Sequence, residues 1–152
     1  MLFIRLTIGS DDYIIDTTDV IEIIPLVTLK ELPGSDASVT GLLNYHGKST
    51  PVIDMGALCE QATTSTTLTT RIILVRYQDK LLGLITDGVT ETLRLEENDF
   101  KQTGIKVGNK EFLGDVVEYN NRFLQRIHID QLLTDSIRNA LFNDDSSKRE
   151  AG

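Results

Sequence analysis

The chain has 152 residues, a formal net charge of -8 and hydrophobic residues at 40% of its positions, which is enough for one domain with a sizeable core. The negative charge disfavours nucleic acid and anionic lipid surfaces as partners, and no apolar run approaches the roughly 18 residues that a membrane-spanning helix needs. A single cysteine excludes an internal disulfide and is typical of a reducing compartment, so we expect a cytoplasmic protein.

The first part of the chain is predicted to form short strands. Apolar and polar residues alternate over residues 3–8, which indicates a half-buried strand, and residues 13–16 return as the second arm of a hairpin. We interpret residues 17–24 as a short turn running into a strand that Pro25 ends. Residues 26–38 contain the turn cluster Pro33-Gly34-Ser35-Asp36, so they are expected to connect two elements.

The most informative stretch is residues 40–54, Thr-Gly-Leu-Leu-Asn-Tyr-His-Gly-Lys-Ser-Thr-Pro-Val-Ile-Asp. Two strand-forming runs flank a turn in which Gly47 supplies the positive φ that a short hairpin loop needs. Pro51 cannot donate a ladder hydrogen bond, so the second strand lies at a sheet edge or Pro51 faces outward near its start. Asp54 is expected to cap a short helix over residues 55–61.

The middle of the chain begins with a stretch of threonine and serine at residues 62–70, which we interpret as a mobile surface loop or a linker between barrels. The following pattern predicts strands at 71–77 and 81–85 and a turn that leads into a strand at 86–95. Residues 101–107 are predicted to form a further strand, followed by a turn at 108–110.

The last part of the chain is predicted to form a hairpin and a helix. Residues 112–119 and 122–129 form the hairpin arms around Asn120 and Asn121. Apolar residues then recur at helical spacing behind Asp130, which predicts an amphipathic terminal helix with Asp130 as its cap. Its apolar stripe consists of Ile129, Leu132, Leu133, Ile137, Ala140 and Leu141.

The chain contains an internal repeat. Residues 18–22 resemble residues 86–91, and in each half a glycine, a hairpin and an Ile-Asp pair that opens a helix follow in the same order. Duplication of a small antiparallel unit explains this order. Short strands, glycine-rich turns and few helices favour closed barrels, because closure removes edge strands. The fold class is therefore predicted to be mainly all-β.

The residues offer little support for an enzyme. His46, His128 and Cys59 lack the spacing of a zinc site, and no phosphate-binding glycine loop is present, so we expect neither a metal nor a cofactor. A small hydrolase or transferase using Cys59 and His128, with Asp130, is the alternative. Cys59 lies on the apolar side of a short helix, where a thiol is more simply a small hydrophobic side chain.

The remaining candidates are carboxylates, which have a simpler explanation. Glu22, Asp54, Asp87 and Asp130 stand where caps and turn residues belong. No convergent catalytic set is left, so the function is predicted to be binding.

Three motifs resemble those of the CheW-like domain, the adaptor of bacterial chemosensory arrays. Residues 41–54 follow the family pattern Gly-x-x-Asn-x-Arg-Gly-x-x-x-Pro-[Val/Ile]-[Val/Ile]-Asp except at one position. Residues 20–23 match a Val-x-Glu-Ile segment that follows the first hairpin. Residues 83–89 match a Gly-[Leu/Ile]-[Val/Ile]-[Val/Thr]-Asp-x-Val segment, and the resemblance extends over about residues 3–133.

The resemblance implies two packed five-stranded SH3-like barrels with short helices and a C-terminal helix. We expect one CheW-like domain of two barrel subdomains, roughly residues 1–66 and 67–142 with strand exchange, and a flexible tail at 143–152. The implied function is a non-enzymatic adaptor that couples a methyl-accepting chemoreceptor to the regulatory domain of a CheA-type histidine kinase. It would serve chemotaxis, twitching or surface sensing at the inner face of the membrane, without inserting into it.

The resemblance also implies a receptor-binding groove between the barrels, near Val20, Glu22, Ile23, Leu42, Asn44, His46 and Val89. Kinase contacts belong to the flanks of both barrels. The one departure from the motif is His46, where the family has Arg, which is expected to pair with the residue matched by Glu22. Two alternatives follow: His46 pairs with Glu22, or His46 is a solvated turn residue. The departure indicates a divergent receptor or a parallel array.

Overall fold

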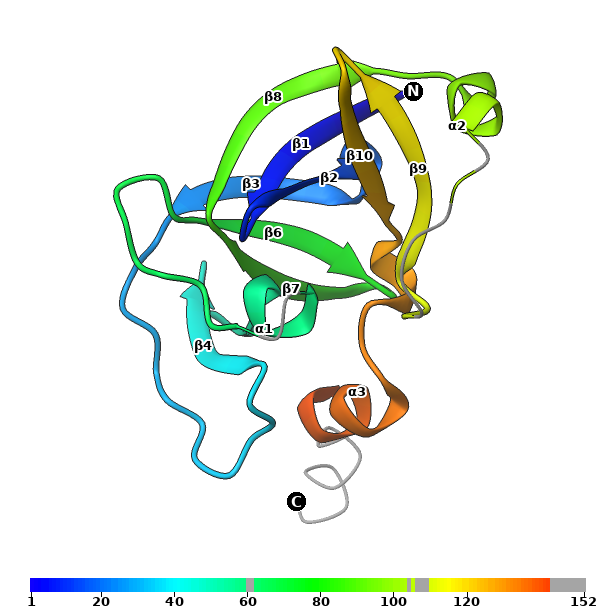
Figure 1. Ribbon diagram of the computed structural model, residues 1–152. Helices are drawn as coiled ribbons and strands as arrows, with labels where there is room; N and C mark the ends of the chain where they lie inside the picture. The colour runs from blue at the N-terminus through cyan, green and yellow to red at the C-terminus, as the bar shows by residue number, and fades with distance from the viewer. Residues whose placement is uncertain (60–61, 104, 106–109, 143–152) are drawn as a thin grey trace.

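The computed structural model describes residues 1–59, 62–103, 105 and 110–142, and its ten strands form two five-stranded sheets (Figure 1). Sheet A has the order β8-β1-β2-β10-β9, and sheet B has the order β3-β6-β7-β5-β4. In sheet A the strands are β8 (Gly88–Arg94), β1 (Leu2–Ile8), β2 (Asp11–Asp16), β10 (Arg122–Ile127) and β9 (Leu113–Tyr119). In sheet B they are β3 (Val20–Pro25), β6 (Arg71–Tyr77), β7 (Lys80–Thr86), β5 (Lys48–Asp54) and β4 (Val39–Tyr45).

The two sheets repeat one topology. If each strand of β1 to β5 is matched with the strand five places later, the order of sheet B reproduces that of sheet A. The β1–β2 hairpin lies in sheet A with three strands of the second half, and the β6–β7 hairpin lies in sheet B with three strands of the first. The two halves join through the parallel pairs β2–β10 and β5–β7 and the antiparallel pairs β1–β8 and β3–β6. The division near residue 66 stays a prediction.

The described residues form three apolar clusters. The largest lies between the two sheets and combines residues such as Leu6 and Ile15 of sheet A with Ile73 and Leu84 of sheet B, and we call it the shared core. The concave side of sheet A holds a second cluster that includes Phe3. A third lies on the other side of sheet B. Because side chains alternate along a strand, each sheet supplies both the shared core and a core of its own.

Short helices join the strands. They are η1 (Thr17–Asp19), α1 (Met55–Cys59), α2 (Glu97–Thr103), η2 (Ile129–Gln131) and α3 (Asp135–Phe142). The turn before β3 is capped by Asp16, whose carboxylate accepts the amide of Thr18. Apart from the strand predicted at 101–107, the strands, hairpins and mainly β architecture predicted from the sequence are confirmed.

The predicted strand at 101–107 is wrong where the chain is described, because Lys101 and the two residues after it end helix α2. The carboxylate of Asp99 accepts the amide of Glu96 at 2.7 Å, which caps the helix start. Phe100 is buried against Phe3, with 5.7 Å between their ring centroids, so tertiary packing fixes the helix. Residues 104 and 106–109 lie outside the described residues, as does most of the predicted turn at 108–110.

The predicted terminal helix is also wrong in part. The apolar stripe is divided between η2, which carries Ile129, and α3, and Asp130 lies inside the 3-10 turn rather than at a cap. The hydroxyl of Thr134 accepts the amide of Ile137 at 3.2 Å and so starts α3. The break lets Leu133 enter the shared core, against which Ile137 and Leu141 of α3 pack as partly buried residues. The predicted tail at 143–152 lies outside the described residues.

Pro51 lies in an inner strand, not at a sheet edge, since β5 runs between β7 and β4. The first residues of β5 pair only with β4, and the pairing of β5 with β7 begins at Val52. Leu42, the residue opposite Pro51 on β4, exchanges its backbone hydrogen bonds with Lys30, so the missing N–H of Pro51 interrupts no hydrogen bond with β4.

Candidate functional site

The glycine that opens the central motif allows two chain segments to touch. Lys30 and Leu42 exchange backbone hydrogen bonds of 2.9 and 2.7 Å, which fastens the connection before β4 to that strand. A Cβ atom on Gly41 would lie 2.4 Å from the carbonyl oxygen of Lys30. Only glycine fits there without displacing the connection.

The β4–β5 turn explains two further motif residues. His46 and Gly47 have φ values of 51° and 83°, and the side-chain oxygen of Asn44 accepts the amide of Gly47 at 2.9 Å. Asn44 therefore closes the turn from within. The exposed His46 ring lies edge-on to that of Tyr45, with centroids 4.4 Å apart.

Asp54, the last residue of the motif, is 5% exposed and fastens two segments. Its Oδ1 accepts the amide of Ala57 at 3.2 Å, as expected of a helix cap. Oδ1 also accepts the hydroxyl of Thr64 at 2.6 Å, and Oδ2 accepts the Thr64 amide at 3.0 Å. The threonine-rich stretch is thus anchored at Thr64, and the motif has a structural explanation at each of these positions.

Glu22 pairs with Tyr45 rather than with His46. The Tyr45 hydroxyl donates to Glu22 Oε1 at 2.5 Å, and this hydrogen bond raises the pKa of Tyr45. No ion pair joins Glu22 and His46 in the part of the chain that the structure describes. Since β3 and β4 are opposite edges of sheet B, the Tyr45–Glu22 contact bridges the two edges as the sheet curls.

The seven residues predicted for the groove fall in three places. Val20 and Val89 are half-buried against the shared core, and Ile23, 38% exposed, follows on β3. The second place is the contact between β3 and the β4–β5 turn. It holds Glu22 on β3, which accepts the Tyr45 hydroxyl, and Asn44 and His46 in the turn. Leu42 lies elsewhere, in a cleft beside α3.

The cleft beside α3 has a volume of about 980 Å³ and was not predicted from the sequence. Its walls are the turn at 32–36, the start of β5 and the α3 residues Ile137 and Leu141. Phe142 also lines the cleft, and its ring stacks on Tyr77 and lies 5.7 Å from the Lys80 ammonium. Only tertiary structure brings these segments together.

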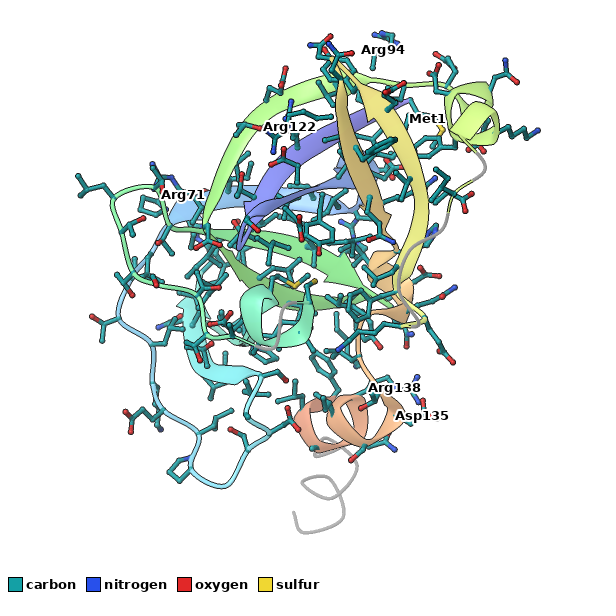
Figure 2. All side chains as sticks on the ribbon, in the orientation of Figure 1. Met1, Arg71, Arg94, Arg122, Asp135 and Arg138 are labelled. Carbon is teal, nitrogen blue, oxygen red and sulfur yellow. The ribbon has the colours of Figure 1, made fainter. Side chains whose placement is uncertain are left out.

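A second concave site, the β1–β6–β8 pocket, lies where the two sheets meet. It has a volume of about 310 Å³ and is lined by Thr7, Thr69, Arg71, Asp87 and residues 88–90. Arg71 is labelled in Figure 2, near the ends of β3 and β6. Val89 was predicted to be a site residue, whereas Arg71 was not, because a charged residue opening a strand carries no distinctive pattern.

Three residues belong to the alternative hypothesis of a hydrolase or transferase, and each makes contacts that a structural role explains. Cys59 ends α1 and is half-buried against the shared core. The imidazole of His128 lies against Gly114, where an added Cβ would be 2.5 Å from Nε2. The backbone carbonyl of Asp130 accepts the side chain of Gln78.

Neither a metal centre nor a membrane-spanning helix is found among the described residues. No group of three or more His, Cys, Asp or Glu side chains is placed to hold a metal ion within this part of the chain. No helix in it is both long and apolar enough to span a bilayer.

Comparison with known proteins gives consistent results. The family model of the CheW-like domain matches residues 2–136. Chemotaxis protein CheW of Helicobacter pylori is 23% identical over 132 residues, which cover 86% of this chain and 80% of that protein. The protein of the same name from Bacillus subtilis is 26% identical over 128 residues, covering 83% and 82%.

A solved structure has the same fold. The scaffolding protein TtCheW from Thermoanaerobacter tengcongensis superimposes with a TM-score of 0.78 at 22% identity. The match covers 90% of this chain and 89% of that one, so it includes both sheets.

Proposed function

The chain belongs to the family of CheW-like domains, and from this premise we propose that it couples a chemoreceptor to the regulatory domain of a CheA-type histidine kinase. The family consists of non-enzymatic adaptors, and the chain is one of them. Its half-buried Cys59 then acts as a small core residue, not as a nucleophile.

One observation carries this proposal. The family match extends from β1 into α3, so it includes both sheets and the shared core between them. An adaptor needs surfaces for two partners at once, and a duplicated fold offers two related sheets for this purpose. The names of the relatives, chemotaxis proteins of two distant bacteria, support the same pathway class.

We assign the receptor surface to the edge where the two sheets meet. Val20, Ile23 and Val89 leave apolar surface accessible along β3 and β8. Glu22 on β3 and Asn44 and His46 in the neighbouring β4–β5 hairpin supply polar groups. Half-exposed apolar side chains with a polar rim are typical of interfaces that form and separate. Leu42 belongs to the cleft beside α3 and is assigned to no receptor contact.

The kinase is assigned to the flanks of the two barrel subdomains, residues 1–66 and 67–142. Assembly of this kind would hold the adaptor at the cytoplasmic face of the membrane through its partners. The formal charge of -8 argues against direct binding to anionic lipid.

Two separate titrations test the proposal. Isothermal calorimetry should detect binding of the protein to a CheA-type regulatory domain and to a chemoreceptor hairpin fragment from the same genome. The binding sites should be independent, so the receptor fragment should bind equally well to the adaptor–kinase complex. An adaptor that binds neither partner, or that binds only one at a time, would refute the coupling role.

A further inference from the structure

The β1–β6–β8 pocket contains a cation, Arg71, that has no carboxylate partner among the described residues. Within the described residues, Arg71 is the only arginine that is partly buried and has no carboxylate within 4.0 Å. Arg5 and Arg126, which are also partly buried, have such partners, whereas Arg76 and Arg94 are exposed. Partial burial of a charge costs free energy unless an opposite charge or hydrogen bonds offset it.

The Arg71 guanidinium is held in place but not saturated. Its Nη1 donates to the carbonyl oxygens of Leu68 and Thr70, each at 2.8 Å. In the described part of the chain, Nη2 and Nε donate to no acceptor, which leaves three of the five N–H groups available. Two N–H groups on one side of a guanidinium match the two oxygens of a carboxylate.

The other polar groups of the pocket leave room for such an anion. The hydroxyls of Thr7 and Thr90 make long hydrogen bonds, 3.4 Å to Asp12 and 3.3 Å to the Arg5 carbonyl. Asp87 also lines the pocket, but its Oδ2 accepts the Gly9 amide at 2.6 Å and it forms no ion pair with Arg71.

Exposed apolar side chains lie on the segments that adjoin Arg71. Pro25 on β3 lies opposite Arg71, and Ile23 lies opposite Ile73, so alternation places Ile23 and Arg71 on the same face of the strand pair. Ile23 is 38% exposed, Val27 just beyond β3 is 45% exposed and Leu68 is 96% exposed. A fixed cation among apolar side chains fits a partner that presents one acid among apolar residues.

We propose that Arg71 and the β1–β6–β8 pocket form a subsite for a glutamate or aspartate side chain of the receptor, seated on the apolar surface of Ile23, Val27 and Leu68. This inference rests on the proposed adaptor function, because it specifies the chemistry of one partner. The carboxylate accepts two N–H groups of Arg71, and Thr90 turns its hydroxyl toward the anion.

A titration with N-acetylglutamate tests the pocket without a receptor. Nitrogen-15 NMR at constant ionic strength should show a saturable shift of the Arg71 Nε–H signal and of the Gly88 and Thr90 amides. Arg76 is the matched control, since it lies on the same strand, is exposed and forms no ion pair in the described residues. The variant Arg71→Gln should lose the amide shifts. An Arg71 signal that moves no more than that of Arg76 overturns the inference.

The receptor fragment gives a second readout. Arg71→Glu should weaken its binding by at least about tenfold, whereas Arg76→Glu should change it by less than about twofold. If a receptor binds the native protein and Arg71→Glu equally well, the subsite is wrong and the adaptor function stands. If no receptor binds but N-acetylglutamate shifts Arg71, the adaptor function fails and the carboxylate site stands.

Discussion

Asp12 lies at the centre of a charge network on the concave side of sheet A, and its removal is the sharpest test of what holds this sheet closed. The Asp12 carboxylate forms ion pairs with Nη2 of Arg5 and Nε of Arg122, each at 2.9 Å. The Asp12 side chain is 8% exposed. Arg5 also reaches Glu91 on β8 at 2.9 Å. The network therefore links strands β8, β1, β2 and β10.

The variant Asp12→Asn should lower the free energy of unfolding by about 2–3 kcal/mol. Hydrogen bonds to charged groups contribute about 1.5–3 kcal/mol each, but Arg122 is 58% exposed, so solvent screens its share. Arg5 has a buried Nε without a partner in the described structure, so it depends on Asp12 and Glu91. For a chain of this size the midpoint of thermal unfolding should fall by roughly 4–12 °C.

The contribution of Asp12 to the free energy of unfolding should depend on pH. Burial raises the pKa of Asp12, but the hydrogen bond and charge of Arg5, helped by Arg122, outweigh burial and hold that pKa below its ordinary value of 3.8. A lowered folded-state pKa means that the stabilisation is present above pH 3.8 and is lost as the pH falls through the folded value. Native protein and Asp12→Asn should therefore become equally stable in acid.

Urea unfolding followed by circular dichroism measures this directly. Asp11→Asn is the matched control, because Asp11 is the adjacent, exposed acid and the charge change is identical. The explanation is refuted if the two variants are equally stable at neutral pH, or if the deficit of Asp12→Asn persists in acid.

Three further substitutions or reactions test other parts of the structure. Leu133→Ala should cost about 2–5 kcal/mol of unfolding free energy, because Leu133 is 7% exposed in the shared core, and an unchanged melting temperature would contradict that role. Gly41→Ala should cost about 1–3 kcal/mol through its clash with Lys30, whereas Gly88→Ala, whose Cβ would meet Thr69 at 3.6 Å, should be tolerated in a thermal melt. Cys59 should react with iodoacetamide more slowly than free cysteine at neutral pH, and rapid alkylation would revive the enzyme alternative.

The strands were predictable because their signals are local. Alternation over residues 3–8 and the paired asparagines at 120 and 121 each fix a strand or turn within a few residues. The repeat also predicted the duplicated architecture, since it orders glycine, hairpin and Ile-Asp alike in both halves. Which hairpin joins which sheet depends on long-range pairing, such as that of β2 with β10.

The errors have tertiary causes. The strand predicted at 101–107 gave way to α2 because Phe100 packs on Phe3 from the first strand, nearly a hundred residues away in sequence. The terminal apolar stripe kept its helical spacing across a break, because Leu133 is buried in the shared core whereas the α3 residues Ile137 and Leu141 pack against that core only partly buried. Periodicity alone cannot detect either constraint.

The candidate site was predictable only in part. The motif located the β4–β5 hairpin, but it did not reveal that Tyr45, next to His46, is the residue that reaches Glu22. It placed Leu42 with residues that lie in another part of the molecule. Arg71 was missed because its importance depends on burial and on the absence of a partner in the described structure, and neither can be read from residue order.

Kinase coupling is the most direct test of the central claim. Autophosphorylation of a CheA-type kinase should be measured with receptor arrays from the same genome, with and without this protein, and with Asp11→Asn and Arg76→Glu as variants that leave the receptor surface intact. Receptor control of the kinase should appear only when the protein is added, and both variants should support it at a temperature where they are folded. Equal kinase activity with and without the protein, although both partners are active, would contradict the adaptor role.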